Sequence, residues 1–182
     1  MFVLASASPR RKKLLADAGF SFEVIPSDAE EVKDASLSPQ DLAVSLAELK
    51  CKSVYNLCKK PCLGADTIVV LDGKVLGKPK NKAENIEYLK KLSGRVHSVI
   101  TGYCFMKDSV TVKGYDQAFV KFNDLSDELT SAYVESGNGL DKAGGYGIQD
   151  GFDLVEKIDG SYSCVVGLPM EKVTQILKEN RV

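Results

Sequence analysis

The stretch CLGADTIVVLDGKVLGKP, residues 62–79, is the strongest indication of how this chain folds. Two apolar runs flank Asp72-Gly73, and an Asp-Gly pair between apolar runs is the clearest short-range signal of a β-hairpin. Pairing the strands outward from that turn places Leu71 opposite Lys74 and Asp66 opposite Pro79. The centre of the predicted fold is therefore a sheet.

Helical and strand patterns alternate on both sides of this hairpin. Ser8-Pro9 and Ser38-Pro39 predict two helix starts, because a serine cap followed by a first-turn proline favours them. Strands are expected at 2–5, 20–25, 95–107 and 110–122, and helices at 9–18, 39–57, 81–92, 126–136 and from 169 onward. A glycine-rich loop at 137–151 precedes an expected hairpin at Asp159-Gly160. This alternation predicts an α/β fold with a mixed sheet.

Composition argues against several classes of protein. The chain has 182 residues, 44% hydrophobic and 27% charged, which is typical of a globular protein. A formal charge of −1 argues against general adhesion to nucleic acid or membranes. No apolar run is long enough to span a bilayer, and MFVLASAS places apolar residues before the charges, unlike a signal peptide. Five cysteines without CxxC spacing predict free thiols in a reducing cytoplasm.

Four consecutive cations at 10–13 follow the cap of the first helix. The backbone N–H groups of a helix start already carry about half a positive charge, so cations there repel one another unless an anion binds. Arginines can hold phosphate oxygens in pairs, and Ser6 and Ser8 add hydroxyl donors. We therefore expect Arg10 and Arg11 to bind phosphate, with the two lysines on the surface. A solvated basic helix face is the alternative.

Asp66 begins an apolar run, where a carboxylate loses hydration unless a cation or hydrogen bonds offset the loss. Lys78 and Lys80 come close to it along the expected hairpin, either as a structural ion pair or as part of a site. Lys50 lies at the edge of the apolar stripe of its helix, where it either covers the core with its stem or reaches an anion. Glu31, in a polar loop, is expected on the surface unless it joins a site.

The single histidine, His97, sits in an apolar, strand-like run and is expected to have a structural role. Catalysis by a serine–histidine or cysteine–histidine pair is therefore disfavoured. Several glycines precede Gln149, and because no GK[ST] follows them, this loop is not a P-loop. The glycines either let the backbone approach a flat ligand or serve ordinary turns.

Six motifs together resemble the Maf family of nucleotide pyrophosphatases, in the family's order and over nearly the whole chain. They are SASPRR at 6–11, GADTIVV at 64–70, GKP at 77–79, LSGRVH at 92–97, DKAGGYGIQ at 141–149 and VVGLP at 165–169. The resemblance implies an elongated, twisted mixed sheet flanked by helices, in a single domain over 1–182 with two lobes around a central cleft, similar to inosine triphosphate pyrophosphatase. It also implies hydrolysis of a nucleoside triphosphate to the monophosphate and pyrophosphate with a divalent cation, Mg²⁺ or Mn²⁺.

The resemblance also implies site residues. The family uses the positions occupied here by Ser6, Arg10, Arg11, Glu31, Lys50, Asp66, Lys78 and Gln149. Asp66, Lys50 and Glu31 are expected to be catalytic, with the two carboxylates on the metal, and the others to bind substrate. Asp66 either activates water as a base or ligates the ion, and both roles stay open. Cys51 and Asp150 depart from a common alanine and a common glycine without removing an expected functional group.

Substrate choice follows from GADT and YGIQ, which are the forms of the group that prefers dTTP and UTP. A second group, acting on 7-methyl-GTP, carries GSDQ and a glutamate at the position of Gln149. A glutamine amide complements the N3–H and carbonyl of thymine or uracil. We therefore expect a house-cleaning enzyme for dTTP and UTP, with modified pyrimidine nucleotides left open. Activity on 7-methyl-GTP and a non-catalytic role in septum formation are the alternatives, and a homodimer is left open.

Overall fold

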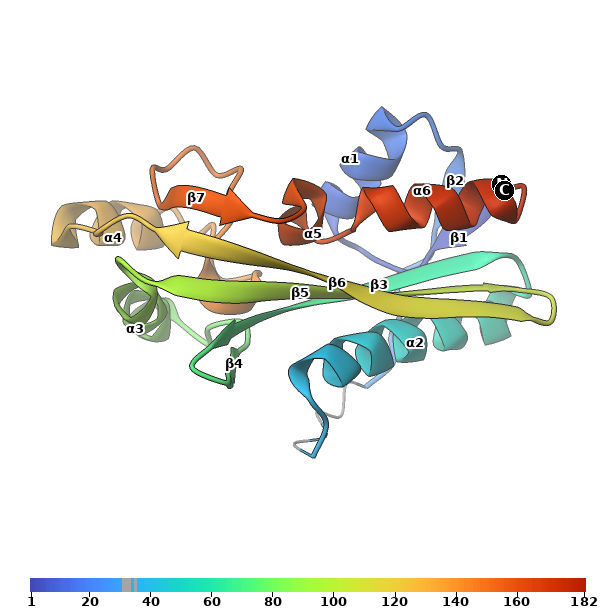
Figure 1. Cartoon of the computed structure of the whole chain (residues 1–182), viewed down its shortest axis with the longest axis horizontal. Helices are drawn as coiled ribbons and strands as arrows, with labels where there is room; N and C mark the ends of the chain where they lie inside the picture. Colours follow the sequence, from blue (N-terminus) through green and yellow to red (C-terminus); the bar gives the residue numbers. More distant parts are fainter. Residues whose placement is uncertain (31–33, 35) are drawn as a thin grey trace. The chain divides into compact units, whose positions relative to one another are not determined.

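A computed structural model describes residues 1–30, 34 and 36–182 of the chain. Within these residues strands and helices alternate, as the sequence predicts (Figure 1). In chain order the elements are β1 (Phe2–Leu4), α1 (Pro9–Asp17), β2 (Phe22–Val24), α2 (Pro39–Cys58), β3 (Cys62–Leu71), β4 (Lys74–Leu76), α3 (Lys82–Leu92), β5 (Val96–Lys107), β6 (Val110–Phe122), α4 (Asp127–Glu135), the 3-10 helix η1 (Ala143–Gly145), β7 (Val155–Asp159), α5 (Tyr162–Val166) and α6 (Met170–Glu179).

The strands of the described residues form a seven-stranded sheet in the order β2-β1-β3-β5-β6-β7, with β4 beside β3. β1 runs parallel to β2 and β3, whereas β4 is antiparallel to β3 and β7 is antiparallel to β6. The predicted mixed sheet is confirmed. The hairpin turn is confirmed as well: Leu71 pairs with Lys74, and Asp72 and Gly73 both have positive φ (50° and 73°), as a tight two-residue turn requires. The predicted pairing of Asp66 with Pro79 is wrong, because β4 ends at Leu76, which pairs with Val69.

The chain divides into two compact units. Unit 1 comprises Met1–Thr67, Thr101–Asp116 and Gly167–Val182. Unit 2 comprises Ile68–Ile100 and Gln117–Val166. The long strands β3, β5 and β6 each contribute residues to both units.

In unit 1, helices cover both faces of the strands (Figure 1). Phe2 and Leu4 of β1 pack in one cluster with α1 and α6, whereas Val3 and Ala5 pack in another with α2. This is the two-residue period of a strand that is buried on both sides. In unit 1, β3, which carries the catalytic candidate Asp66, therefore lies between two layers of helix.

Unit 2 has a core of its own, in which α3 and α4 pack against β5 and β6. Its strand β7 leads through Gly160 into the helix α5 and not into a second strand, so the predicted hairpin at Asp159-Gly160 is wrong. The reason is local: the Ser161 hydroxyl accepts from the backbone N–H of Cys164 at 3.2 Å, which is the capping contact of a helix start.

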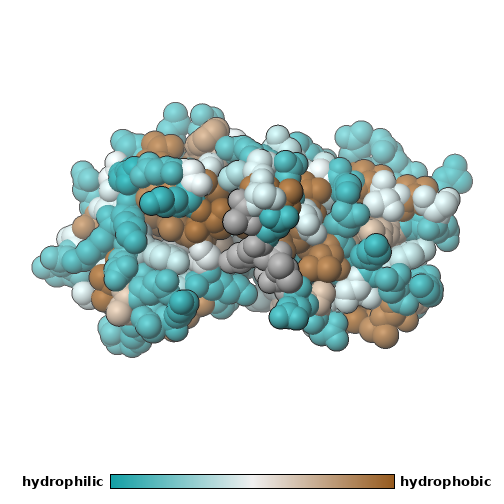
Figure 2. Space-filling view, turned by 90° about the horizontal axis from the view of Figure 1, so that it is seen from below, coloured by the Kyte–Doolittle hydropathy of each residue, from teal (hydrophilic) through white to brown (hydrophobic). Residues whose placement is uncertain are grey.

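Hydrophilic residues predominate on the face shown in Figure 2, with apolar residues scattered between them. None of the helices in the described part of the chain combines the length and apolarity needed to cross a bilayer. All five cysteines are free thiols, as the sequence predicts.

Candidate active site

The start of α1 carries two residues predicted to bind phosphate. The side chain of Ser8 caps the helix by accepting from the backbone N–H of Arg11, and a proline follows the cap. Arg10 is half-buried, and Arg11 is only 9% exposed. Lys12 is half-buried, whereas Lys13 lies on the surface, as predicted, with its side chain 70% exposed.

The guanidinium of Arg11 donates hydrogen bonds to four acceptors within unit 1. Its Nε donates to the carbonyl of Gly167 at 2.7 Å, and its Nη1 donates to the Ser6 hydroxyl at 3.1 Å. Nη1 also donates to the carbonyl of Ala65 at 2.8 Å, and Nη2 donates to the Thr67 hydroxyl at 3.1 Å. This side chain is thus embedded in contacts with the chain itself.

Asp66 of β3 is buried, with 8% of its surface exposed. Lys50 of α2 donates to its Oδ1 and forms an ion pair with it. A buried carboxylate needs such a partner, because an uncompensated charge away from water is strongly destabilising. The structure thus brings together two residues that the sequence identifies as catalytic candidates.

Two glycines let α2 lie close to the sheet at this point. A Cβ at Gly64 would lie 2.5 Å from the carbonyl oxygen of Ala47. A Cβ at Gly102 would overlap the carbonyl group of Ala43. The helix and the two strands therefore approach more closely than a larger residue would permit. This close approach sets the distance between Lys50 and β3.

Lys78 and Gln149, the other two predicted substrate-binding residues, belong to unit 2, and both are exposed. Their convergence with Asp66 on one ligand remains a prediction. Glu31, the predicted second carboxylate, lies outside the described residues.

The glycine-rich loop of unit 2 is fastened by buried polar side chains. Asn85 of α3 donates to the carbonyl of Gly145 at 2.7 Å. The Tyr133 hydroxyl of α4 accepts from the backbone N–H of Gly147 at 2.9 Å and donates to Asp150 at 2.7 Å. Burial raises the pKa of Tyr133, so its hydroxyl keeps the proton that it donates.

Three of the sequence motifs meet around Gly144. Its backbone N–H donates to the carbonyl of Gly77 at 3.0 Å, which joins the GKP motif to the loop. Gly144 has a φ of 72°, and a Cβ there would lie 2.8 Å from a methyl group of Val69, in the GADTIVV motif. The glycine is therefore required both by its conformation and by the space available.

His97 belongs to a buried aromatic cluster with Phe122 and Tyr146. Its Nε2 lies 2.6 Å from the Tyr146 hydroxyl, and within the described residues its Nδ1 has no hydrogen-bond partner. Burial lowers the pKa of His97 to about 4, so the ring is neutral at neutral pH. These contacts agree with the predicted structural role.

The family model for Maf-like proteins matches residues 1–180. The chain belongs to the Maf family. A dTTP/UTP pyrophosphatase of Thermococcus gammatolerans is 48% identical to this Maf protein over 177 residues, which are 97% of this chain and 95% of the relative. A protein of the same name from Bacillus anthracis is 47% identical over 179 residues, 97% of this chain and 94% of the relative.

Among solved structures, a HAM1 protein from Coxiella burnetii resembles this Maf protein with a TM-score of 0.59. Sequence identity is 17%, over 97% of this chain and 98% of the other. At this identity the likeness shows the fold alone, and it confirms the predicted fold class.

Sequence reasoning about this Maf protein missed Thr67, Asn85 and Tyr133. A signal existed for Asn85, because it precedes Leu89 and Leu92 by four and seven positions and so lies on the apolar face of α3. A buried amide at such a position requires a hydrogen-bond partner. No comparable signal marks Tyr133, since a tyrosine on an apolar helix face is ordinary core packing.

Asp66 is the carboxylate of the described residues that is expected to hold a metal ion. Residues 1–30, 34 and 36–182 contain no group of three His, Cys, Asp or Glu side chains that could hold one. Mg²⁺ is usually held by one or two carboxylates together with substrate phosphates, and not by a complete cage of protein ligands. Asp66 fits that pattern as one carboxylate, and Glu31 stays a predicted second one.

Proposed function

We propose that this Maf protein hydrolyses dTTP and UTP to the nucleoside monophosphate and pyrophosphate. The observation that carries the proposal is the buried Lys50–Asp66 pair, in a chain 48% identical over 97% of its length to a relative named dTTP/UTP pyrophosphatase. Residues 1–182 act in this proposal as one catalytic domain.

Attack on the α-phosphorus requires a positioned water and cations that stabilise the developing charge. Asp66 either orients and deprotonates that water or ligates the ion, and the ammonium group of Lys50 holds its carboxylate in place. Asp66 and Glu31 would hold Mg²⁺ or Mn²⁺, which would supply positive charge and a more acidic water.

Ser6, Arg10 and Lys78 are proposed to bind the phosphates, which together carry roughly four negative charges at neutral pH. The oxygen of Ser6 accepts from the backbone N–H of Ser8 at 3.2 Å and from Arg11 at 3.1 Å. A hydroxyl has two acceptor positions and one donor. The O–H group of Ser6 therefore remains the part that can donate to a phosphate oxygen.

Gln149 is proposed to select the base. It is exposed, and its neighbours Gly147 and Asp150 are both held by the Tyr133 hydroxyl, so the backbone around it is fixed. Its amide offers one donor and one acceptor, which complement the N3–H and a carbonyl of thymine or uracil. A carboxylate at this position would suit the adjacent donors of a guanine edge.

The test is release of pyrophosphate from dTTP, UTP, CTP, GTP and 7-methyl-GTP with Mg²⁺ or Mn²⁺, with Asp66→Asn as the matched control. We expect turnover of dTTP and UTP above the other nucleotides, and a loss of at least a hundredfold in Asp66→Asn, on the order of a removed catalytic group. Preference for 7-methyl-GTP would refute the proposed base selection. No turnover of any nucleotide would favour a binding protein, and full activity of Asp66→Asn would refute the carboxylate mechanism.

The proposed role in the cell is removal of surplus or modified pyrimidine nucleotides from the nucleotide pool. Five free cysteines suit a reducing compartment, and we propose the cytoplasm, where such a pool is found.

A further inference from the structure

The contacts of Arg11 are those of a residue that holds the chain in place. A bidentate contact with phosphate needs two neighbouring N–H groups of the guanidinium. The bonds to Gly167, Ser6, Ala65 and Thr67 already use four of its five N–H groups. At most one N–H of Arg11 remains for an anion, so the usual arginine fork on phosphate is not available.

Two of these contacts flank the catalytic candidate of β3. Arg11 binds the carbonyl of Ala65 and the hydroxyl of Thr67, the residues immediately before and after Asp66. Because side chains alternate along a strand, Asp66 faces the side opposite to its neighbours. Ala65 packs in the cluster with α1 and α6, whereas Asp66 meets Lys50 of α2. Arg11 thus binds β3 on the face opposite to the carboxylate of Asp66.

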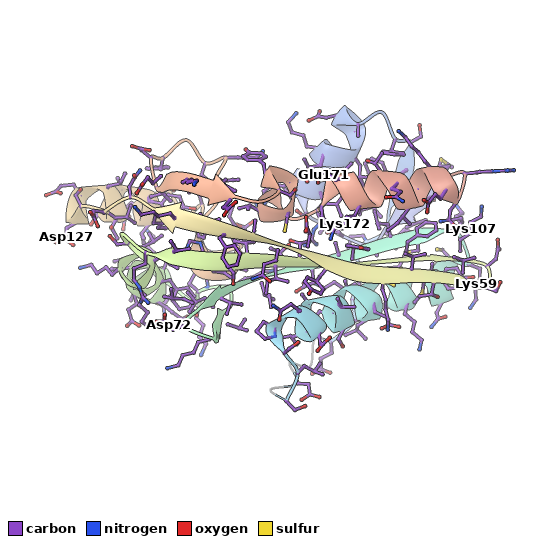
Figure 3. All side chains as sticks on the ribbon, viewed as in Figure 1. Lys59, Asp72, Lys107, Asp127, Glu171 and Lys172 are labelled. Atoms are coloured by element: carbon purple, nitrogen blue, oxygen red, sulfur yellow. The ribbon has the colours of Figure 1, made fainter. Side chains whose placement is uncertain are left out.

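The far anchor of Arg11 lies beside a helix that is tied to the sheet. Gly167 precedes α6, whose two ends are tied to the sheet by lysines labelled in Figure 3. Lys172 donates to the carbonyl of Tyr115 at 3.0 Å, and Lys107 donates to the carbonyl of Asn180 at 2.8 Å. Gly167 has a φ of 122°, and a Cβ there would lie 3.3 Å from the Thr67 hydroxyl. This glycine lets α6 approach Thr67 and Arg11.

Arg11 also orients Ser6. One acceptor position of the Ser6 hydroxyl is taken by Arg11 and the other by the backbone N–H of Ser8. The direction left to the O–H group is therefore set by the arginine together with the backbone N–H of Ser8. One guanidinium thus contacts the surroundings of two groups proposed to act on substrate in unit 1, the carboxylate of Asp66 and the hydroxyl of Ser6.

We infer that Arg11 is a positioning residue of the reaction, which holds Asp66 and Ser6 in register, and that phosphate binding at α1 falls to its neighbour Arg10. The inference rests on the proposed function and revises the expectation from the sequence, in which both arginines bind phosphate. It predicts that loss of the Arg11 contacts lowers the rate of the bound complex far more than it lowers the affinity for phosphate groups, which Arg11 affects only through Ser6.

The experiment compares four single variants, and the double variant of Arg11→Lys and Thr67→Val, by steady-state kinetics with dTTP, by calorimetric titration with pyrophosphate and by thermal unfolding. Arg11→Lys keeps the charge but cannot reach four acceptors, and Thr67→Val removes one acceptor with little change of shape. Arg10→Lys is the comparator for phosphate binding. Leu177→Ala, in the same α1–α6 cluster, breaks none of the four Arg11 hydrogen bonds and is the control for stability.

We expect Arg11→Lys and Thr67→Val to lower kcat by about tenfold or more, because a small misplacement of reacting groups costs that much. In Thr67→Val, KM for dTTP and the affinity for pyrophosphate stay within about twofold of the wild type. In Arg11→Lys they change less than kcat does, because Arg11 reaches phosphate only through Ser6. The double variant loses less than the product of the two single losses, because both break the same contact. Arg10→Lys raises KM instead, and Leu177→Ala lowers the melting temperature with kcat unchanged.

Three results would overturn the inference. One is a raised KM or weaker pyrophosphate binding in Arg11→Lys at unchanged kcat, which makes Arg11 a phosphate ligand. Another is a pair of kcat losses that multiply independently. The third concerns the backbone, and it is measured even if the wild type hydrolyses neither dTTP nor UTP and the proposed function fails. The inference then predicts that the amide resonances of Ala65 and Asp66 shift in both Arg11→Lys and Thr67→Val but not in Leu177→Ala. Unshifted resonances overturn the inference.

Discussion

Replacing Gly64 with alanine should move α2 and thereby impair catalysis. The added Cβ would lie 2.5 Å from the carbonyl oxygen of Ala47 and 2.7 Å from the backbone nitrogen of Cys51, whereas ordinary contact begins at 3.4 Å. The helix must therefore retreat by about 0.9 Å (3.4 minus 2.5), because both neighbours are backbone atoms and no side-chain rotation relieves the overlap. Lys50 precedes Cys51 and is carried away from Asp66.

The expected magnitudes follow from that displacement. Overpacking of this kind costs about 1–3 kcal/mol of unfolding free energy. Misplacing a reacting group by about 1 Å can lower the rate by about a hundredfold. Urea unfolding measures the first quantity, and pyrophosphate release from saturating dTTP measures the second.

Gly19→Ala is the matched control. Gly19 has a φ of 78° with nothing within 4 Å of its missing Cβ, so an alanine there is strained but displaces no neighbour. The strain costs about 1–2 kcal/mol, similar to the overpacking, and kcat should be unchanged. Normal turnover by Gly64→Ala, or an equal loss of turnover in Gly19→Ala, would refute the reasoning that the glycine sets the position of Lys50.

Three further changes test other parts of the molecule. His97→Gln should flatten the loss of stability in acid: the pKa of His97 is about 4 when folded and 6.5 otherwise, so the unfolded chain binds the extra proton as pH falls from 6.5 to 4. In the wild type, protonation of His97 should lower the unfolding free energy, measured by urea unfolding, by about 3 kcal/mol across that pH window. If the unfolding free energy of the variant falls with pH as steeply as that of the wild type, the prediction is contradicted. Gln149→Glu should lower kcat/KM for dTTP and UTP by about tenfold or more. The unfolding free energy should stay within about 0.5 kcal/mol of the wild type, because the side chain is exposed. Unchanged dTTP turnover would show that Gln149 does not select the base. Tyr133→Phe should cost about 1–3 kcal/mol in urea unfolding, because Gly147 loses its acceptor and Asp150 its donor, and a cost near zero would show that the loop does not depend on this hydroxyl.

Elements that depend on contacts between residues close together in the sequence could be predicted from the sequence alone. The caps at Ser8 and Ser38 involve residues three positions apart, and the Asp72-Gly73 turn involves adjacent ones. The same kind of reasoning failed after Gly160, because a turn residue ends a strand without specifying whether a strand or a helix comes next. Ser161, the cap of the helix α5, was the relevant signal.

The candidate site shows the same division. Residue types and their order were enough to identify Lys50, Asp66 and the arginines as candidates, together with the fold class and the family. They could not show that Lys50 is paired with Asp66, or that Arg11 faces inward. Its partner Gly167 is 156 positions away along the chain. A hydrogen bond forms only where donor and acceptor meet at about 3 Å in the right direction. For residues far apart along the chain, that distance is set by how helices and strands pack. Gly64 is an example, because the absence of a Cβ there lets α2 approach the sheet.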